Sequence, residues 1–181
     1  MSKINQKEVR EIIEESRKSG KTDQQIYYEL TRLGYDKKQI ALLITGTATE
    51  ENRARFKTLN TTLLVLLGIT VLFKLLSVLG LTVETGEPMA MLLVFIVPLL
   101  NIYFMYEVAH YRAPVYRLIV ILSVVSVLSA IMRGGDIWDI IISVILGGAI
   151  AFLAFYLDKN MFPKFRPRKM PTDSNGEYVL N

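Results

Sequence analysis

The chain has 181 residues, a formal net charge of +4 and no cysteine. Without cysteine it forms no disulfide and no thiolate metal site, and its single histidine excludes a zinc site made of several histidines from one chain. Apolar residues make up 51% of the sequence and are concentrated between residues 59 and 157. This uneven distribution predicts a membrane region joined to a small domain outside the membrane.

The first 58 residues predict a compact group of short helices followed by a charged stalk. We expect helices at 6–19, 23–33, 37–45 and from 48 onward. Four side chains precede these helices at the spacing of a capping box, with Glu or Gln three residues later: Asn5, Thr22, Asp36 and Thr47. Three glycines follow as left-handed helix stops: Gly20, Gly34 and Gly46. Residues 49–57 contain no Gly or Pro, so the stalk is expected to run into the first membrane helix.

The segment Thr22–Gly46, TDQQIYYELTRLGYDKKQIALLITG, carries a resemblance. It resembles the short helical modules that precede the first membrane helix in prokaryotic membrane proteins. Locally it is also similar to ubiquitin-associated-type domains, whose first two helices meet at a Gly-Tyr or Gly-Phe loop, here at Gly34 and Tyr35. Both resemblances imply an interaction or packing element, with three candidate partner-binding residues: Tyr27, Tyr28 and Tyr35. The alternative is a helical hairpin stabilised only by its own core.

Four apolar runs follow, and they predict membrane-spanning helices at 59–81, 89–109, 115–132 and 137–157. Each run has 18–23 residues, which is enough to cross a hydrocarbon core of roughly 30 Å. In lipid the backbone must satisfy its hydrogen bonds within each segment, which favours helices. The predicted fold is therefore all-α: a four-helix transmembrane bundle with a small N-terminal cytoplasmic helical domain.

The distribution of basic residues predicts the orientation. They flank the spans at three places: Arg53, Arg55 and Lys57; Arg112 and Arg117; and Lys159, Lys164, Arg166, Arg168 and Lys169. The loop between the first two spans has Glu84 and Glu87 but no Lys or Arg. The positive-inside rule therefore places both termini in the cytoplasm. We expect a multi-pass protein of a prokaryotic plasma membrane.

The tail, residues 158–181, is basic and spaced by prolines, which suits contact with anionic lipid headgroups. Its last ten residues, TDSNGEYVLN, are expected to have no ordered structure.

Polar residues inside or beside the spans are the candidate pathway residues, because they are costly in lipid: Lys74, Asn101, Glu107, His110, Asp136 and Asp139. Lys74 either reaches the outer surface, pairs with an acidic residue such as Asp136 or Asp139, or lines a pore. Asn101 follows Pro98 and marks either a kink or a polar point in a pathway. Glu107 and His110 share one helix face, but one such pair is too little for a metal site and suggests a pH-sensitive pair instead.

A stripe of small residues in the fourth span predicts close helix packing: Ser143, Gly147 and Ala151. The stripe fits packing within the chain or a homo-oligomer, and we favour packing within the chain.

The sequence contains no phosphate-binding loop, no nucleophile elbow and no zinc-protease motif. We therefore expect no catalysis, no cofactor and no bound metal. The prediction is a scaffold, adaptor or regulatory subunit whose N-terminal domain contacts a protein partner, and the alternative is a small oligomeric channel or transporter. No nucleic-acid partner is expected, since membrane topology accounts for the basic residues.

Overall fold

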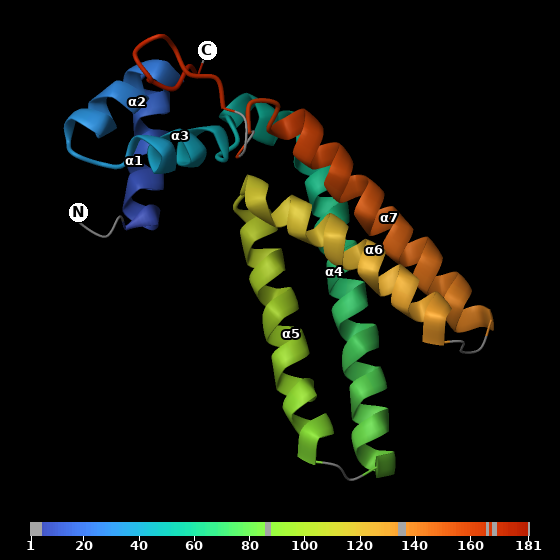
Figure 1. Ribbon diagram of the computed structural model, residues 1–181. Coiled ribbons are helices and arrows are strands. Elements are labelled where there is room, and N and C mark those ends of the chain that lie inside the picture. Colours follow the sequence, from blue (N-terminus) through green and yellow to red (C-terminus); the bar gives the residue numbers. More distant parts are fainter. Residues whose placement is uncertain (1–4, 86–87, 134–136, 166, 168–169, 181) are drawn as a thin grey trace. The chain divides into compact units, whose positions relative to one another are not determined.

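A computed structural model describes the chain except for residues 1–4, 86–87, 134–136, 166, 168–169 and 181, and except for the side chains of residues 74, 77–85, 88–98, 133 and 139. The described residues form helices and no strand, which confirms the all-α prediction (Figure 1). The helices are α1 (Gln6–Lys18), α2 (Asp23–Arg32), α3 (Lys37–Thr45), α4 (Glu50–Thr85), α5 (Pro88–Ala109), α6 (Ala113–Arg133) and α7 (Ile137–Met161). They belong to two compact units. The helical unit comprises residues 1–49 and 162–181, and the membrane unit comprises residues 50–161.

Local side-chain chemistry sets the limits of α2 and α3. Thr22 and Gln25 form the predicted reciprocal capping box, with the Gln25 backbone N–H 3.3 Å from Thr22 Oγ1 and the Thr22 N–H 2.9 Å from Gln25 Oε1. The carboxylate of Asp36 accepts a hydrogen bond from the Gln39 N–H at 2.8 Å. These bonds satisfy donors that the first helical turn leaves open, so each helix begins where the sequence predicts.

Two of the predicted caps are wrong. Asn5 makes no side-chain cap bond. The hydroxyl of Thr47 donates to the carbonyl of Leu43 at 2.7 Å, and the next helix begins only at Glu50. Thr47 is three residues before the start of α4 and is therefore not at its N-cap position.

Two of the three predicted helix stops are confirmed and one is wrong. Gly20 and Gly34 have φ values of +85° and +88°, as expected for left-handed stops. Gly46 has φ −86°, so the prediction of a left-handed residue there is wrong. Space requires glycine at this position instead, because a Cβ would lie 2.7 Å from the Leu42 carbonyl oxygen and 3.2 Å from the Phe165 ring.

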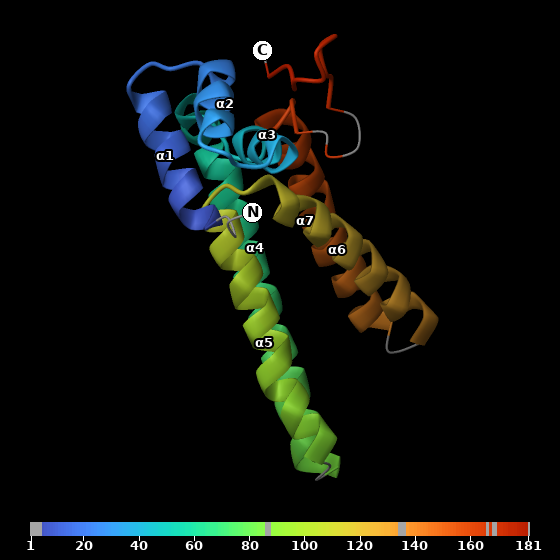
Figure 2. The ribbon, with the colours of Figure 1, turned by 60° about the vertical axis from the view of Figure 1, so that its left-hand side comes forward.

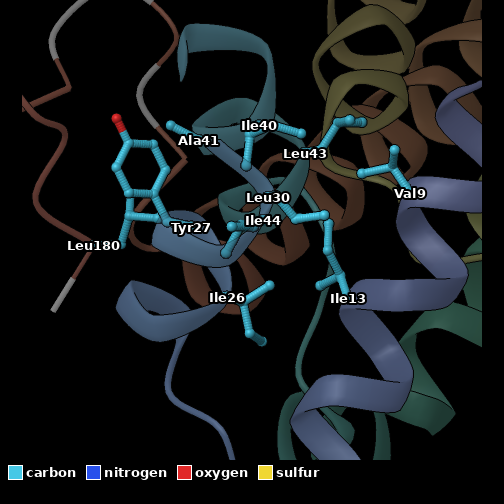
Figure 3. Packing of buried hydrophobic residues seen from close by; sticks show 10 residues of the cluster. All are labelled: Val9, Ile13, Ile26, Tyr27, Leu30, Ile40, Ala41, Leu43, Ile44 and Leu180. Carbon is cyan, nitrogen blue, oxygen red and sulfur yellow. The ribbon is translucent and has the colours of Figure 1, made fainter. Parts of the chain in front are cut away.

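The core of the helical unit is a cluster of ten buried residues, nine from α1–α3 and one from the tail (Figure 3): Val9, Ile13, Ile26, Tyr27, Leu30, Ile40, Ala41, Leu43, Ile44 and Leu180. Arg17 ties the three helices together around it. Its guanidinium donates to the carbonyls of Ile44 (2.9 Å) and Thr47 (3.0 Å) at the end of α3, and it pairs with Asp23 of α2 at 2.8 Å. The Ile44 carbonyl also accepts the Thr47 N–H at 3.3 Å, so Arg17 adds a further donor at the end of α3.

The membrane unit contains four long helices, in which α4 packs on α5 and α6 on α7 (Figures 1 and 2). The charged stalk and the first apolar run form one unbroken helix, α4, of 36 residues, as expected. Three described segments are long and apolar enough to cross a membrane: Glu50–Phe73, Ala113–Met132 and Ile140–Met161. Large aliphatic side chains are exposed along them, among them Leu72, Ile121 and Ile145, which suits a lipid environment. Of α5, the described side chains form a shorter apolar stretch, Leu99–Ala109.

The small-residue stripe lies on a half-buried face of α7. A Cβ on Gly147 would lie 2.6 Å from Cγ2 of Val127 and 3.7 Å from the carbonyl oxygen of Ser123, both in α6. The next residue, Gly148, has nothing within 4 Å of the same position. Gly147 therefore supports packing within the chain at this point of the stripe.

This contrast gives a matched pair of variants. Gly147→Leu is expected to lower the thermal unfolding temperature, since overpacking of this kind costs about 1–3 kcal/mol. Gly148→Leu should leave it near the wild-type value, because its side chain meets open space. Thermal unfolding of both purified variants in detergent is the measurement. Equal unfolding temperatures would contradict close packing of α6 and α7 at Gly147.

Candidate functional site

The structure separates the predicted pathway residues. Lys74, Asp136 and Asp139 fall outside the described residues or side chains, so the channel alternative has no described contact in its favour. Glu107 forms an ion pair with Arg112, whereas Nδ1 of His110 lies 2.8 Å from the Tyr106 carbonyl oxygen. Each of the two therefore has its own partner. Among the described residues no group of three or more His, Asp or Glu is placed to hold a metal ion.

A buried polar network joins three helices of the membrane unit. The side-chain amide of Asn60 in α4 donates to the carbonyl of Val108 in α5 at 3.0 Å. The hydroxyl of Tyr116 in α6 donates to Oδ1 of Asn60 at 2.7 Å. Asn60 is 2% exposed and the Tyr116 side chain is fully buried, so both polar groups find partners inside the protein. Asn101 is also buried. These contacts describe a structural connection between helices.

The end of the tail is ordered, so the expectation of an unstructured segment is wrong. Oδ1 of Asp173 accepts hydrogen bonds from the N–H groups of Asn175 (2.9 Å) and Glu177 (2.8 Å). Gly176 adopts φ +75°, a conformation that favours glycine. The turn brings Thr172 and Tyr178 together as an isolated antiparallel bridge. Asp and Gly at these positions bond and bend the backbone locally, which orders the segment before it meets the helices.

Three side chains bond to the backbone of the tail. The Tyr27 hydroxyl of α2 accepts from the N–H of Tyr178 at 3.5 Å, the ammonium of Lys164 donates to the carbonyl of Leu180 at 3.0 Å, and Gln24 of α2 makes two bonds. Nε2 of Gln24 donates to the carbonyl of Tyr178 at 3.1 Å, and Oε1 of Gln24 accepts from the N–H of Leu180 at 2.8 Å. One amide thus satisfies an acceptor and a donor of an extended backbone, as a neighbouring strand does. Leu180 itself is 2% exposed and joins the apolar core beside Tyr27 (Figure 3).

The carboxylate of Glu177 is held by two groups of the helices. Its Oε2 accepts from the hydroxyl of Tyr27 at 2.8 Å, and its Oε1 pairs with the ammonium of Lys37. Figure 3 shows the Tyr27 hydroxyl pointing away from the apolar cluster. We call Gln24, Tyr27 and Lys37, together with the apolar surface that holds Leu180, the tail site.

The pKa values of Glu177 and Tyr27 favour their hydrogen bond at neutral pH. The hydrogen bond from Lys37, followed by that from Tyr27, lowers the pKa of Glu177 below its usual range. Burial, followed by the hydrogen bond to Glu177, raises the pKa of Tyr27 to about 12. At pH 7 Glu177 is therefore a carboxylate and Tyr27 a neutral hydroxyl, which is the pair that the observed hydrogen bond needs.

The three predicted partner-binding tyrosines differ in their surroundings. The side chain of Tyr27 is buried and bonded to the tail, as described above. Tyr28 is 43% exposed and its ring lies edge-on to that of Tyr27, at a centroid distance of 5.6 Å. Tyr35 is partly buried against the core cluster. Their role in binding another protein stays a prediction.

Sequence reasoning missed the other residues of the tail site and its occupant: Gln24, Lys37, Glu177, Tyr178 and Leu180. The one local indication in the sequence was the turn motif Asp173-Ser-Asn-Gly176, which lies directly before residues 177–180.

No family model matches the sequence, and no curated protein or solved structure shows detectable similarity to it.

The lowered pKa of Glu177 predicts that docking of the tail weakens in acid. Docking is strengthened above the ordinary pKa of a glutamate and loses this contribution as pH falls through the lower pKa of the folded state. Because the chain lacks cysteine, dyes on cysteines placed at Ser19 and Asn175 report the position of the tail by energy transfer. We expect the transfer to change between pH 7 and pH 3.

The control is Glu177→Gln in the same labelled protein. It should show weaker docking at pH 7, since Lys37 loses its anionic partner, and a smaller change with pH. Identical pH profiles for the two proteins would rule out Glu177 as the titrating group.

Proposed function

We propose that the protein is a four-span membrane adaptor, in which the helical unit lies in the cytoplasm and binds an extended segment of another protein. The proposed role involves no catalysis. The observation that carries it is the tail site, where helices α2 and α3 hold four residues of extended chain. Gln24 bonds to their backbone, Tyr27 and Lys37 hold the carboxylate of Glu177, and the apolar core takes up Leu180. Reading a backbone while selecting a few side chains is a recurring mode of peptide recognition.

The helical unit contains chain from before and after the membrane unit, which supports an even number of membrane crossings. Gln24 and Leu180 are hydrogen-bonded within one compact unit, although they precede and follow the entire membrane unit in the chain. A folded unit of this kind must lie on one side of a bilayer. A chain that leaves one side and returns to it crosses an even number of times.

Three described helices qualify as spans, so the even number requires one more. The candidate is α5, whose 22 residues correspond to about 33 Å of helix, enough for a hydrocarbon core of roughly 30 Å. The excess of Lys and Arg beside the shared side favours the cytoplasm for the helical unit.

Cysteine labelling of intact cells tests this topology. Single cysteines at Ser19 and Asn175 should both resist a membrane-impermeant reagent, because the two positions belong to one unit. Single cysteines at Thr85 and Gly135 should both react from outside. Reaction of only one of Ser19 and Asn175 would contradict an even number of crossings, and reaction of both would reverse the orientation.

Photo-cross-linking tests the adaptor role in the full-length protein. A photoreactive amino acid at the exposed Tyr28, next to the tail site, is expected to give one protein adduct of constant mass in native membranes. The matched control places the same amino acid at Ile145, an exposed residue of the α7 span, where cross-linking to lipid is expected. Reconstituted vesicles should show no ion flux. Flux from the protein without a protein adduct at Tyr28 would favour a channel and overturn the adaptor proposal.

A further inference from the structure

We propose that the tail is a displaceable occupant of the tail site, and that the site's ligand is an extended segment of a partner protein carrying a carboxylate and, three residues later, an aliphatic side chain. This inference rests on the proposed adaptor function. It adds the chemistry of the ligand and the way in which access to the site is controlled.

The contacts at the tail site do not depend on the tail's belonging to the same chain. Gln24 bonds only to backbone groups, the carbonyl of Tyr178 and the N–H of Leu180, which every extended peptide presents. The ring of Tyr178 lies edge-on to that of Tyr27 at a centroid distance of 6.3 Å, and two side chains of the tail are held more closely. Glu177 lies against Tyr27 and Lys37, and Leu180 enters the apolar cluster. The order carboxylate, two residues, aliphatic side chain therefore defines the ligand.

Most of the contacts that hold the helices of the site together do not involve residues 173–181. Nine of the ten core residues belong to α1, α2 and α3. The three bonds of Arg17 to Ile44, Thr47 and Asp23 also lie entirely within residues 17–47. Removal of residues 173–181 from the site therefore leaves nine of the ten core residues and this clamp in place.

The tail is held by contacts that exchange readily. The side chain of Lys37 is 53% exposed and that of Glu177 24% exposed, so water and salt screen their attraction. Leu180 is the one tail residue among the ten core residues, and Met170 and Tyr178 of the tail pack partly buried against them. A partner segment with a carboxylate and a leucine at the same positions presents the same groups to the site.

Because the tail is attached to the chain, it competes for the site more effectively than a free peptide of the same sequence. A tethered segment acts at an effective concentration of the order of millimolar, so a free ligand must outcompete it. The apparent affinity of the site is then reduced by the fraction of molecules in which the tail is docked. Releasing the tail is expected to raise the affinity for an external segment by about tenfold or more.

Peptide binding to the full-length protein in nanodiscs tests the proposal. The probe is a fluorescent peptide with the sequence of residues 173–181, DSNGEYVLN, followed by fluorescence anisotropy. The released variant carries Glu177→Ala and Leu180→Asp and should bind the probe at least tenfold more tightly than the wild type. Adding Gln24→Ala and Lys37→Ala to the released variant should abolish this gain. A control peptide with Ala and Asp at the two selected positions should bind neither protein.

A charge exchange provides a second route that keeps Leu180 in place. Lys37→Glu should weaken docking of the native tail, because it sets a carboxylate against Glu177. This variant should prefer a probe with Lys in place of the Glu over the original probe, while the wild-type protein should not.

The inference is overturned if the released variant and Lys37→Glu both lose their helical circular dichroism. The tail would then be a required part of the core. It is also overturned if a folded released variant does not bind the probe, or if the wild type binds the probe equally well. A third contradicting result is a wild-type dimer that exchanges tails, seen as a doubling of the particle mass when the protein concentration is raised. A folded released variant that ignores the probe while the Tyr28 adduct persists removes this inference alone. Loss of the adduct removes the adaptor proposal as well.

Discussion

The hydrogen bonds between the Gln24 amide and the backbone of Tyr178 and Leu180 join the two ends of the chain in one folded unit. Everything between residues 50 and 161 is therefore a loop of chain that starts and finishes at the same unit. This constraint is what turns three qualifying membrane helices into an argument for a fourth. It also places the end of the tail against α2 and α3.

The two units follow different rules of stability. The helical unit has short helices of 9–13 residues, which are marginal alone in water and depend on a shared core and on the Arg17 clamp. The membrane unit has helices of 21–36 residues with many exposed aliphatic side chains. There the backbone satisfies itself within each helix, and polar groups such as Asn60 and Tyr116 bond between helices.

Local signals in the sequence were enough to predict the helices but not the tail site. Apolar runs and the caps at Thr22 and Asp36 located the helices, since each is a contact within a few residues. The prediction at Thr47 was wrong although its bond to the Leu43 carbonyl is local, because a cap and a bond back to the preceding turn use the same residue type. At Gly46 the ring of Phe165, which is distant in the sequence, adds to the crowding by the Leu42 carbonyl. Gln24 and Leu180 lie 156 residues apart, and neither belongs to a periodic pattern that relates the two. Their contact could only emerge from three-dimensional structure.

A unit built from both ends of a chain also has a consequence for biosynthesis. Leu180 is translated 156 residues after Gln24, which is about 8–30 s at the usual rates of elongation. During that interval the helices of residues 6–45 expose the surface that Leu180 later covers. A chain that inserted one span too few would carry Leu180 to the opposite side of the membrane, and this surface would stay open. In the proposed topology, closure of the helical unit therefore requires Leu180 to end on the same side of the membrane as residues 6–45.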